Sequence, residues 1–178
     1  MSTQRYGYGT MLLHWVHAIL VLGLIAWGLY MSELPKGPER SFAIGVHKSF
    51  GIVALAVVIL RLLWRRSHPA PADLRLSEVE HKLATAGHHL LYMLLVLTPL
   101  AGYLSASFTQ YPMRFFGIVL PKPGWPDERF NAFFNGAHVF LAWSLTAMIT
   151  VHLAAVVLHA IRKKPVMGRM LPGRTPID

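Results

Sequence analysis

Four histidines lie within, or at the edge of, otherwise apolar segments of the chain: His14, His47, His138 and His152. His138 and His152 are fourteen residues apart on one such segment. Fourteen residues make nearly four turns of an α-helix, so both rings leave almost the same face, about 21 Å apart along the helix axis. Because the hydrocarbon core of a bilayer is about 30 Å thick, one helix can present a histidine near each side of a membrane.

Imidazole side chains at these positions are suited to binding haem iron. Two neutral imidazoles on opposite faces of a haem fill both axial positions, so that the haem carries electrons but has no open site for dioxygen. A histidine within lipid is unfavourable unless it is paired or ligated. We therefore predict two haems stacked across the membrane, each held by two histidines. For any single histidine, the alternative is a hydrogen bond to a neighbouring carbonyl.

The composition favours a membrane protein. Of the 178 residues, 54% are hydrophobic and 14% are charged, whereas a soluble domain has about 25% charged residues. Four apolar stretches are long enough to cross a bilayer as helices: about residues 11–30, 43–63, 88–107 and 133–161. The first is too long for the apolar region of a signal peptide, so we expect it to be retained. The sequence predicts an all-α integral membrane four-helix bundle, with residues 1–178 in one domain.

The charged residues and the lack of cysteine narrow the function further. Without cysteine, the chain has no disulfides, thiolate zinc sites, iron–sulfur clusters or covalently attached haem. The net charge of +9 arises from basic clusters at the ends of the apolar stretches, which membrane topology explains better than nucleic-acid binding does. Eleven of the 17 Lys and Arg residues fall in the N-terminal tail, the second connection and the C-terminal tail. The positive-inside rule then predicts that both termini are cytoplasmic.

This orientation sorts the four histidines by depth. His47 and His138 are expected near the outer surface, and His14 and His152 near the inner one. Glycines along the same stretches would let a flat macrocycle approach the backbone, although ordinary close helix packing uses glycine as well. These glycines are Gly23, Gly28, Gly45, Gly51, Gly102 and Gly136.

The remaining histidines leave alternatives open. His17 lies one turn from His14 and His159 two turns from His152, so either could replace its neighbour as a ligand. His17, His88, His89 and His159 are candidates for a redox or quinone role, and His88 and His159 also for contact with a haem propionate. The alternative is that all four are interfacial residues that face lipid headgroups. His68 and His81 fall in the charged inner connection, where solvated histidines are expected.

The third connection, residues 108–132, contains four prolines, which exclude a continuous helix. It also contains aromatic and aliphatic residues that a polar linker would not need. We therefore expect this connection to fold back over the outer end of the bundle.

In the order and spacing of its motifs, the chain resembles the bacterial cytochrome b561 family of four-helix di-haem proteins over nearly its whole length. The resemblance rests on short motifs: Tyr6 to His14-Trp15, His47 with Gly51, Arg61-Leu62-Leu63-Trp64-Arg65, Gly87-His88 with Tyr92, His138, His152, and Arg169-Met170-Leu171-Pro172.

The resemblance implies two b haems, with His14, His47, His138 and His152 as axial iron ligands. It also implies electron exchange with a quinone in the bacterial cytoplasmic (inner) membrane. One branch of the family consists of superoxide oxidases, enzymes that pass electrons from superoxide at the outer face to ubiquinone. Related b cytochromes instead serve as membrane subunits of hydrogenases and formate dehydrogenases.

Basic residues on the predicted outer face favour the superoxide branch. Lys48 follows an expected ligand directly, and Arg114, Lys122 and Arg129 lie in or beside the third connection. A basic funnel would raise the encounter rate of a small anion such as superoxide. The alternatives are contact with lipid headgroups or docking of an acidic protein.

We therefore predict a superoxide:ubiquinone oxidoreductase. The second hypothesis is a haem-b electron-transfer subunit that anchors a dehydrogenase or hydrogenase. The third is a transporter lined by histidines, which the absence of Asp and Glu from the apolar stretches disfavours.

Overall fold

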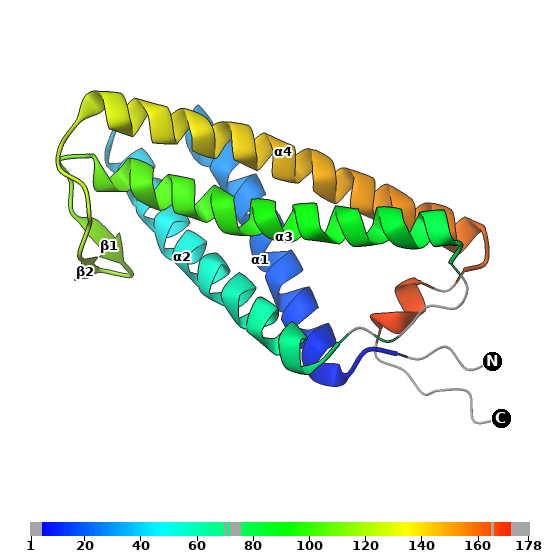
Figure 1. Cartoon of the computed structure of the whole chain (residues 1–178). Coiled ribbons are helices and arrows are strands. Elements are labelled where there is room, and N and C mark those ends of the chain that lie inside the picture. The colour runs from blue at the N-terminus through cyan, green and yellow to red at the C-terminus, as the bar shows by residue number, and fades with distance from the viewer. Residues whose placement is uncertain (1–4, 70, 72–75, 165, 172–178) are drawn as a thin grey trace.

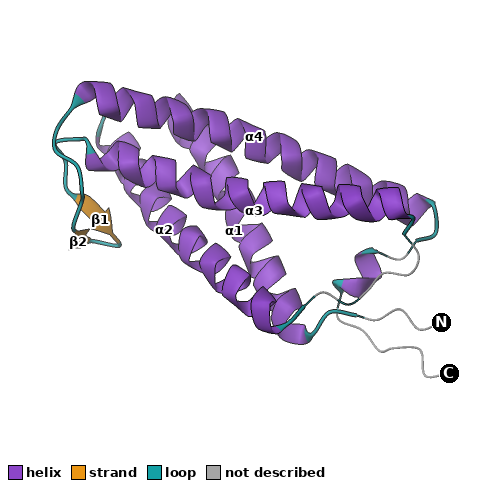
Figure 2. Ribbon diagram, viewed as in Figure 1, coloured by secondary structure: helices purple, strands orange, loops and turns teal. Residues whose placement is uncertain are grey.

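The computed structural model describes residues 5–69, 71, 76–164 and 166–171. Its four long helices are α1 (Tyr8–Glu33), α2 (Pro38–Ser67), α3 (Glu78–Ser107) and α4 (Glu128–Ile161). A β-hairpin of β1 (Met113–Phe115) and β2 (Ile118–Leu120) precedes α4, and a short 3₁₀ helix, η1 (Met167–Arg169), follows it (Figures 1 and 2). All four long helices are apolar enough to cross a membrane, with mean hydropathies of 1.9, 2.1, 1.6 and 2.0. The predicted all-α membrane architecture is confirmed.

All four helices begin before the apolar stretches, and polar side chains cap the starts of α3 and α4. Helix α3 begins with a capping box, in which the Ser77 hydroxyl accepts from the Glu80 amide and the Glu80 carboxylate accepts from the Ser77 amide. The Asp127 side chain likewise caps α4 by accepting two backbone N–H bonds. Helices α3 and α4 therefore begin ten and five residues before the predicted positions 88 and 133.

The bundle consists of two helix pairs. Helices α3 and α4 run side by side along their lengths, and α1 packs with α2, which also contacts α3 (Figure 1). The backbone amide of Tyr6 donates to the carbonyl of Arg169 over 3.2 Å. We call this end of the bundle, where α1 and α3 begin and α2 and α4 end, the terminal end. The opposite end, which carries β1 and β2, is the hairpin end.

The core of the bundle lies where α1, α3 and α4 meet. Its buried centre is formed by Val21, Leu94 and Leu145, with partly buried aliphatic side chains packed around it. Leu145 is seven residues from both His138 and His152, which places all three on one face of α4. Many other large apolar side chains are exposed on the outside of the bundle. This distribution is typical of helices that lipid surrounds.

The third connection folds back onto α2, as predicted, but it contains two strands that the sequence analysis did not predict. Strands β1 and β2 are antiparallel and are joined by Phe116 and Gly117, whose φ angles are 47° and 94°. Positive φ at both central residues is typical of the tightest hairpin turns. The Phe116 amide donates to the Ser49 hydroxyl over 3.0 Å, and its ring packs against Phe50. The turn is thereby fixed beside the first half of α2.

At the terminal end, η1 joins parts of the chain that are distant in sequence. Arg169 is 6% exposed, and its guanidinium lies over the ring of Tyr6. The indole N–H of Trp15 donates to the carbonyl of Met170 over 2.7 Å. The segment after α4 therefore ties the start of α1 to the end of the described chain.

Candidate functional site

At the hairpin end, His47 of α2 and His138 of α4 face each other across the two helix pairs. Their ring centroids are 6.1 Å apart and the ring planes are nearly perpendicular, at 86°. The Nδ1 of His138 donates to the main-chain carbonyl of Thr98 over 2.9 Å. A neutral imidazole that carries its proton on Nδ1 has a free lone pair on Nε2. His138 is therefore oriented as a metal ligand usually is, with its second nitrogen held by a carbonyl.

Two glycines allow these rings to lie close to neighbouring helices. A Cβ atom on Gly102 of α3 would lie 3.0 Å from Nδ1 of His138, and a Cβ on Gly28 of α1 would lie 3.4 Å from Cε1 of His47. The position of the His138 ring therefore depends on Gly102 having no side chain. Of the glycines noted in the sequence, these two are the ones that contact the paired histidines.

The hairpin-level pair, His47 and His138, fits a bis-imidazole iron. Two ligands on opposite sides of one metal place their ring centres about 6 Å apart, because each metal–nitrogen bond is about 2 Å long and each centre lies about 1 Å beyond its nitrogen. The observed 6.1 Å meets this requirement. Within the described residues, no three His, Cys, Asp or Glu side chains converge on a metal site.

At the terminal end, the imidazoles of His14, His88 and His152 form a second group. We call these three residues and Arg61 the terminal-level cluster. The rings of His88 and His152 have centroids 5.7 Å apart and an interplanar angle of 66°. His14, on α1, lies close enough to His88 and His152 for their charges to interact. The structure thus brings His14 and His152 to one level but places His88 in direct ring contact with His152.

Arg61 of α2 projects into this cluster. Its Nη2 donates to Nδ1 of His14 over 3.2 Å, and its Nη1 donates to Nδ1 of His17 over 3.0 Å. The guanidinium also lies over the ring of Tyr92, 5.3 Å from the centroid. Since arginine only donates, both histidines accept at Nδ1 and carry their proton on Nε2. For His14 to bind iron through Nε2, its proton would have to move from Nε2 to Nδ1 and Nη2 would have to release Nδ1, while Nη1 could remain on His17.

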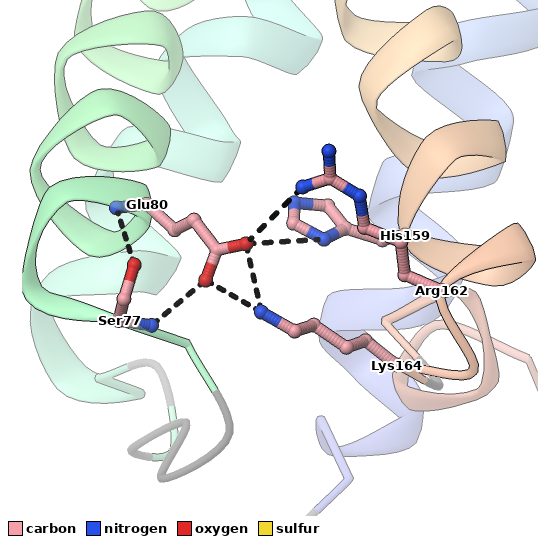
Figure 3. Close-up of polar contacts among 5 residues, drawn as sticks. All are labelled: Ser77, Glu80, His159, Arg162 and Lys164. Carbon is pink, nitrogen blue, oxygen red and sulfur yellow. Dashed lines mark hydrogen bonds and ion pairs between the residues drawn. The ribbon is translucent and has the colours of Figure 1, made fainter.

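His159 belongs to a separate polar cluster, which lies where α3 begins and α4 ends (Figure 3). Lys164 donates to both carboxylate oxygens of Glu80, at 2.7 and 2.6 Å. Nδ1 of His159 and Nη1 of Arg162 lie 4.0 and 3.9 Å from the same carboxylate. The carboxylate of Glu80 thus joins the start of α3 to the end of α4 and places a titratable pair at the edge of the bundle.

The basic residues predicted to steer an anion lie at the hairpin end, in different settings. Lys48 is half-buried one residue from His47, and its charge interacts with that of Lys122. Lys122 is held by the backbone carbonyls of Thr109 and Tyr111. Arg114 is exposed on the hairpin, where it donates to the carbonyl of Gly117 over 3.2 Å. Lys48 and Lys122 therefore form one positive region at the hairpin end, and Arg114 is exposed on the hairpin.

The other histidines have local roles. His89 donates to the carbonyl of Thr85 one turn earlier, over 2.9 Å. His68 stacks on Trp64, with ring centroids 4.0 Å apart, and His81 is exposed. The contacts of Arg61 were not predicted from the sequence. The position of this arginine inside an apolar stretch was the signal that could have identified it.

Comparison with known proteins agrees with this architecture. The family model described as prokaryotic cytochrome b561 matches residues 5–173. Among curated proteins, the chain is 35% identical to "Cytochrome b561 homolog 2" of Escherichia coli (strain K12), across 99% of this chain and 96% of that protein. It is 27% identical to "Probable superoxide oxidase CybB" of Yersinia pestis, across 90% and 92%. With this extent of similarity and four membrane-spanning helices, the chain belongs to the prokaryotic cytochrome b561 family of electron-transfer proteins, which implies haem b.

Proposed function

We propose that the protein is a di-haem cytochrome of the bacterial inner membrane that passes electrons from superoxide to ubiquinone. His47 and His138 would hold one haem at the hairpin end, and His14 and His152 the other at the terminal end. The observation that carries the proposal is the opposed pair of His47 and His138, with centroids 6.1 Å apart. The terminal end would face the cytoplasm, in keeping with the excess of Lys and Arg in the segments found there.

The choice of His14 over His88 as the partner of His152 rests on the arrangement of the helices. Axial ligands lie on opposite faces of a macrocycle, so they come from elements that the macrocycle separates. His88 and His152 lie on α3 and α4, which are packed along each other (Figure 1). His14 lies on α1, which belongs to the other helix pair. The hairpin-level pair has the same arrangement, because His47 lies on α2 and His138 on α4. His88 is then a neighbour of the site, available to a propionate or a quinone.

The proposed reaction balances electrons and protons. Two superoxide anions each give up one electron and leave as dioxygen, and one ubiquinone accepts two electrons and two protons to become the quinol. Haem b, when bound, supplies a one-electron carrier at each level. The histidines hold these carriers, and the buried side chains around Leu145 keep water from the space between the two levels.

The positive region at the hairpin end supports superoxide as the donor. Lys48 and Lys122 would raise the local concentration of a small anion beside the hairpin-level pair. Transfer at this site needs no vacant iron position, because the electron can move to a haem whose axial positions are both filled. The relative from Yersinia pestis, whose name is that of a probable superoxide oxidase, is consistent with this choice.

Ubiquinone would bind near the terminal end, where the protons come from the cytoplasm. His88 lies beside His152, and His159 lies 4.0 Å from Glu80 at the mouth of the same helix pair. A histidine next to a carboxylate can deliver protons to a reduced quinone. We expect His159 to contribute at this step.

The proposal is tested with purified protein in detergent or liposomes. Haem content should be two per chain, and the reduced protein should have a b-type spectrum. In stopped flow, superoxide should reduce the haems, and added ubiquinone should reoxidise them. If superoxide leaves the haems oxidised while a dehydrogenase or another donor reduces them, the protein is an electron-transfer subunit and the superoxide assignment fails.

A further inference from the structure

Arg61 is a cation inside the apolar part of the bundle. Its guanidinium donates to His14 and His17 and lies over the ring of Tyr92, and its side chain is half-buried. Within the part of the chain that the structure describes, no carboxylate lies within ion-pair distance of it. Its partners are imidazole rings and an aromatic face, which carry no negative charge when neutral.

A cation without a countercharge acts on whatever lies near it in a medium of low dielectric constant. The charge of Arg61 reaches His14, His88 and His152, all of which it affects electrostatically. These are the imidazoles of the terminal-level cluster. The positive field therefore acts at the level where the second haem is proposed to lie.

We propose that Arg61 raises the reduction potential of the haem at the terminal level. The inference rests on the proposed function, because it requires a haem at that level. Adding one electron lowers the charge of the site by one, and a fixed cation nearby stabilises the reduced form over the oxidised one. Electrons that enter at the hairpin end are thereby drawn towards the quinone side.

His17 is the positioning residue for Arg61. Its side chain is 1% exposed, and its Nδ1 accepts from Nη1 of the guanidinium. This contact does not involve Nη2, which is the nitrogen that must leave His14 when His14 binds iron. His17 therefore keeps the cation in the cluster.

The test is an optical redox titration of the full-length, haem-loaded protein. Arg61→Gln should move one of the two midpoint potentials downwards and leave the other unchanged. The midpoint that shifts should be the one that is still present in His47→Ala, because that variant should keep only the terminal-level haem. Arg66→Gln is the matched control, because Arg66 lies at the same end of α2 but is exposed, and its charge is not among those that act on His14, His88 or His152. Its two waves should match those of the unsubstituted protein.

Two results would overturn the inference. One is an unchanged pair of midpoints in Arg61→Gln, and the other is an equal shift in Arg66→Gln. Should Arg61→Gln bind only one haem, Arg61→Lys decides the matter. Lysine keeps the positive charge, so the midpoint of the terminal-level haem should stay close to that of the unsubstituted protein. A large fall of that midpoint despite the retained charge would contradict the electrostatic role. A haem content below two in the unsubstituted protein would instead refute the proposed function.

Discussion

The imidazole of His138 and the carbonyl of Thr98 are joined by a 2.9 Å hydrogen bond that links α4 to α3. Thr98 lies directly before Pro99, inside a helix that continues through the proline. The bond sets the tautomer of His138, because a carbonyl can only accept. It thereby fixes which nitrogen is left for iron before any cofactor is considered.

Gly102→Ala should disturb the hairpin-level haem selectively. The new methyl group would lie 3.0 Å from Nδ1 of His138, and overpacking of this kind costs about 1–3 kcal/mol. We expect lower occupancy or a shifted midpoint for one haem, measured by pyridine haemochrome assay and redox titration. The control is Gly136→Ala, since a Cβ there meets nothing within 4 Å. Equal effects in both variants would mean that helix flexibility, and not the His138 contact, is responsible.

Alanine substitution of the histidines should separate the two haems. His47→Ala and His138→Ala should each lose the same haem, and His14→Ala and His152→Ala should each lose the other. His88→Ala should retain both. Haem stoichiometry and the reduced spectrum of each purified variant provide the measurement. Loss of a haem in His88→Ala, together with its retention in His14→Ala, would reassign the partner of His152.

Lys48→Glu should slow reduction by superoxide by about tenfold at low ionic strength, because it reverses the charge beside His47. The difference should shrink in salt, since exposed charges are screened within about 8 Å at physiological ionic strength. Lys36→Glu makes the same charge change at an exposed position of the same end. Stopped-flow rates at two salt concentrations distinguish the two variants. Equal slowing by both would mean that the overall charge of this end, and not the position of Lys48, controls the rate.

Glu80→Gln should lower the thermal stability of the protein. The substitution removes the charge that holds Lys164 at 2.6 and 2.7 Å and so loosens the link between α3 and α4. Glu78→Gln is the control, because Glu78 pairs only with the exposed Lys82 on the same helix. Thermal melts in detergent should show a lower midpoint for Glu80→Gln alone. Matching melts would show that the Glu80 cluster contributes little to stability.

The fold was largely predictable because spanning length and hydropathy are direct physical requirements of the bilayer. The helix boundaries were less so. An apolar stretch marks only the part of a helix inside the membrane, whereas α3 begins at a capping box formed by Ser77 and Glu80. That signal was present in the sequence. The turn at Phe116 and Gly117 carries no strong hairpin motif, so its strands could not be expected from local sequence.

The sequence predicts at which end of the bundle each histidine lies, but not which side chains it contacts. The spacing of His138 and His152 follows from helix geometry alone. Which rings face each other depends on how each helix is rotated about its axis, and sequence does not give that rotation. The ring contact between His88 and His152 and the position of Arg61 are of this kind. Thr98 carried no sequence signal at all, because its backbone makes the contact.

Helix α4 runs without interruption from Glu128 to Ile161 and carries one histidine of each level. The two positions proposed as iron ligands, His138 and His152, are therefore separated by a fixed number of residues and not by the thickness of the bilayer. In a thinner or thicker membrane α4 would change its tilt, but the distance between the two histidines along the helix would stay the same. The rate of transfer between the two irons should then be the same in short-chain and long-chain lipids.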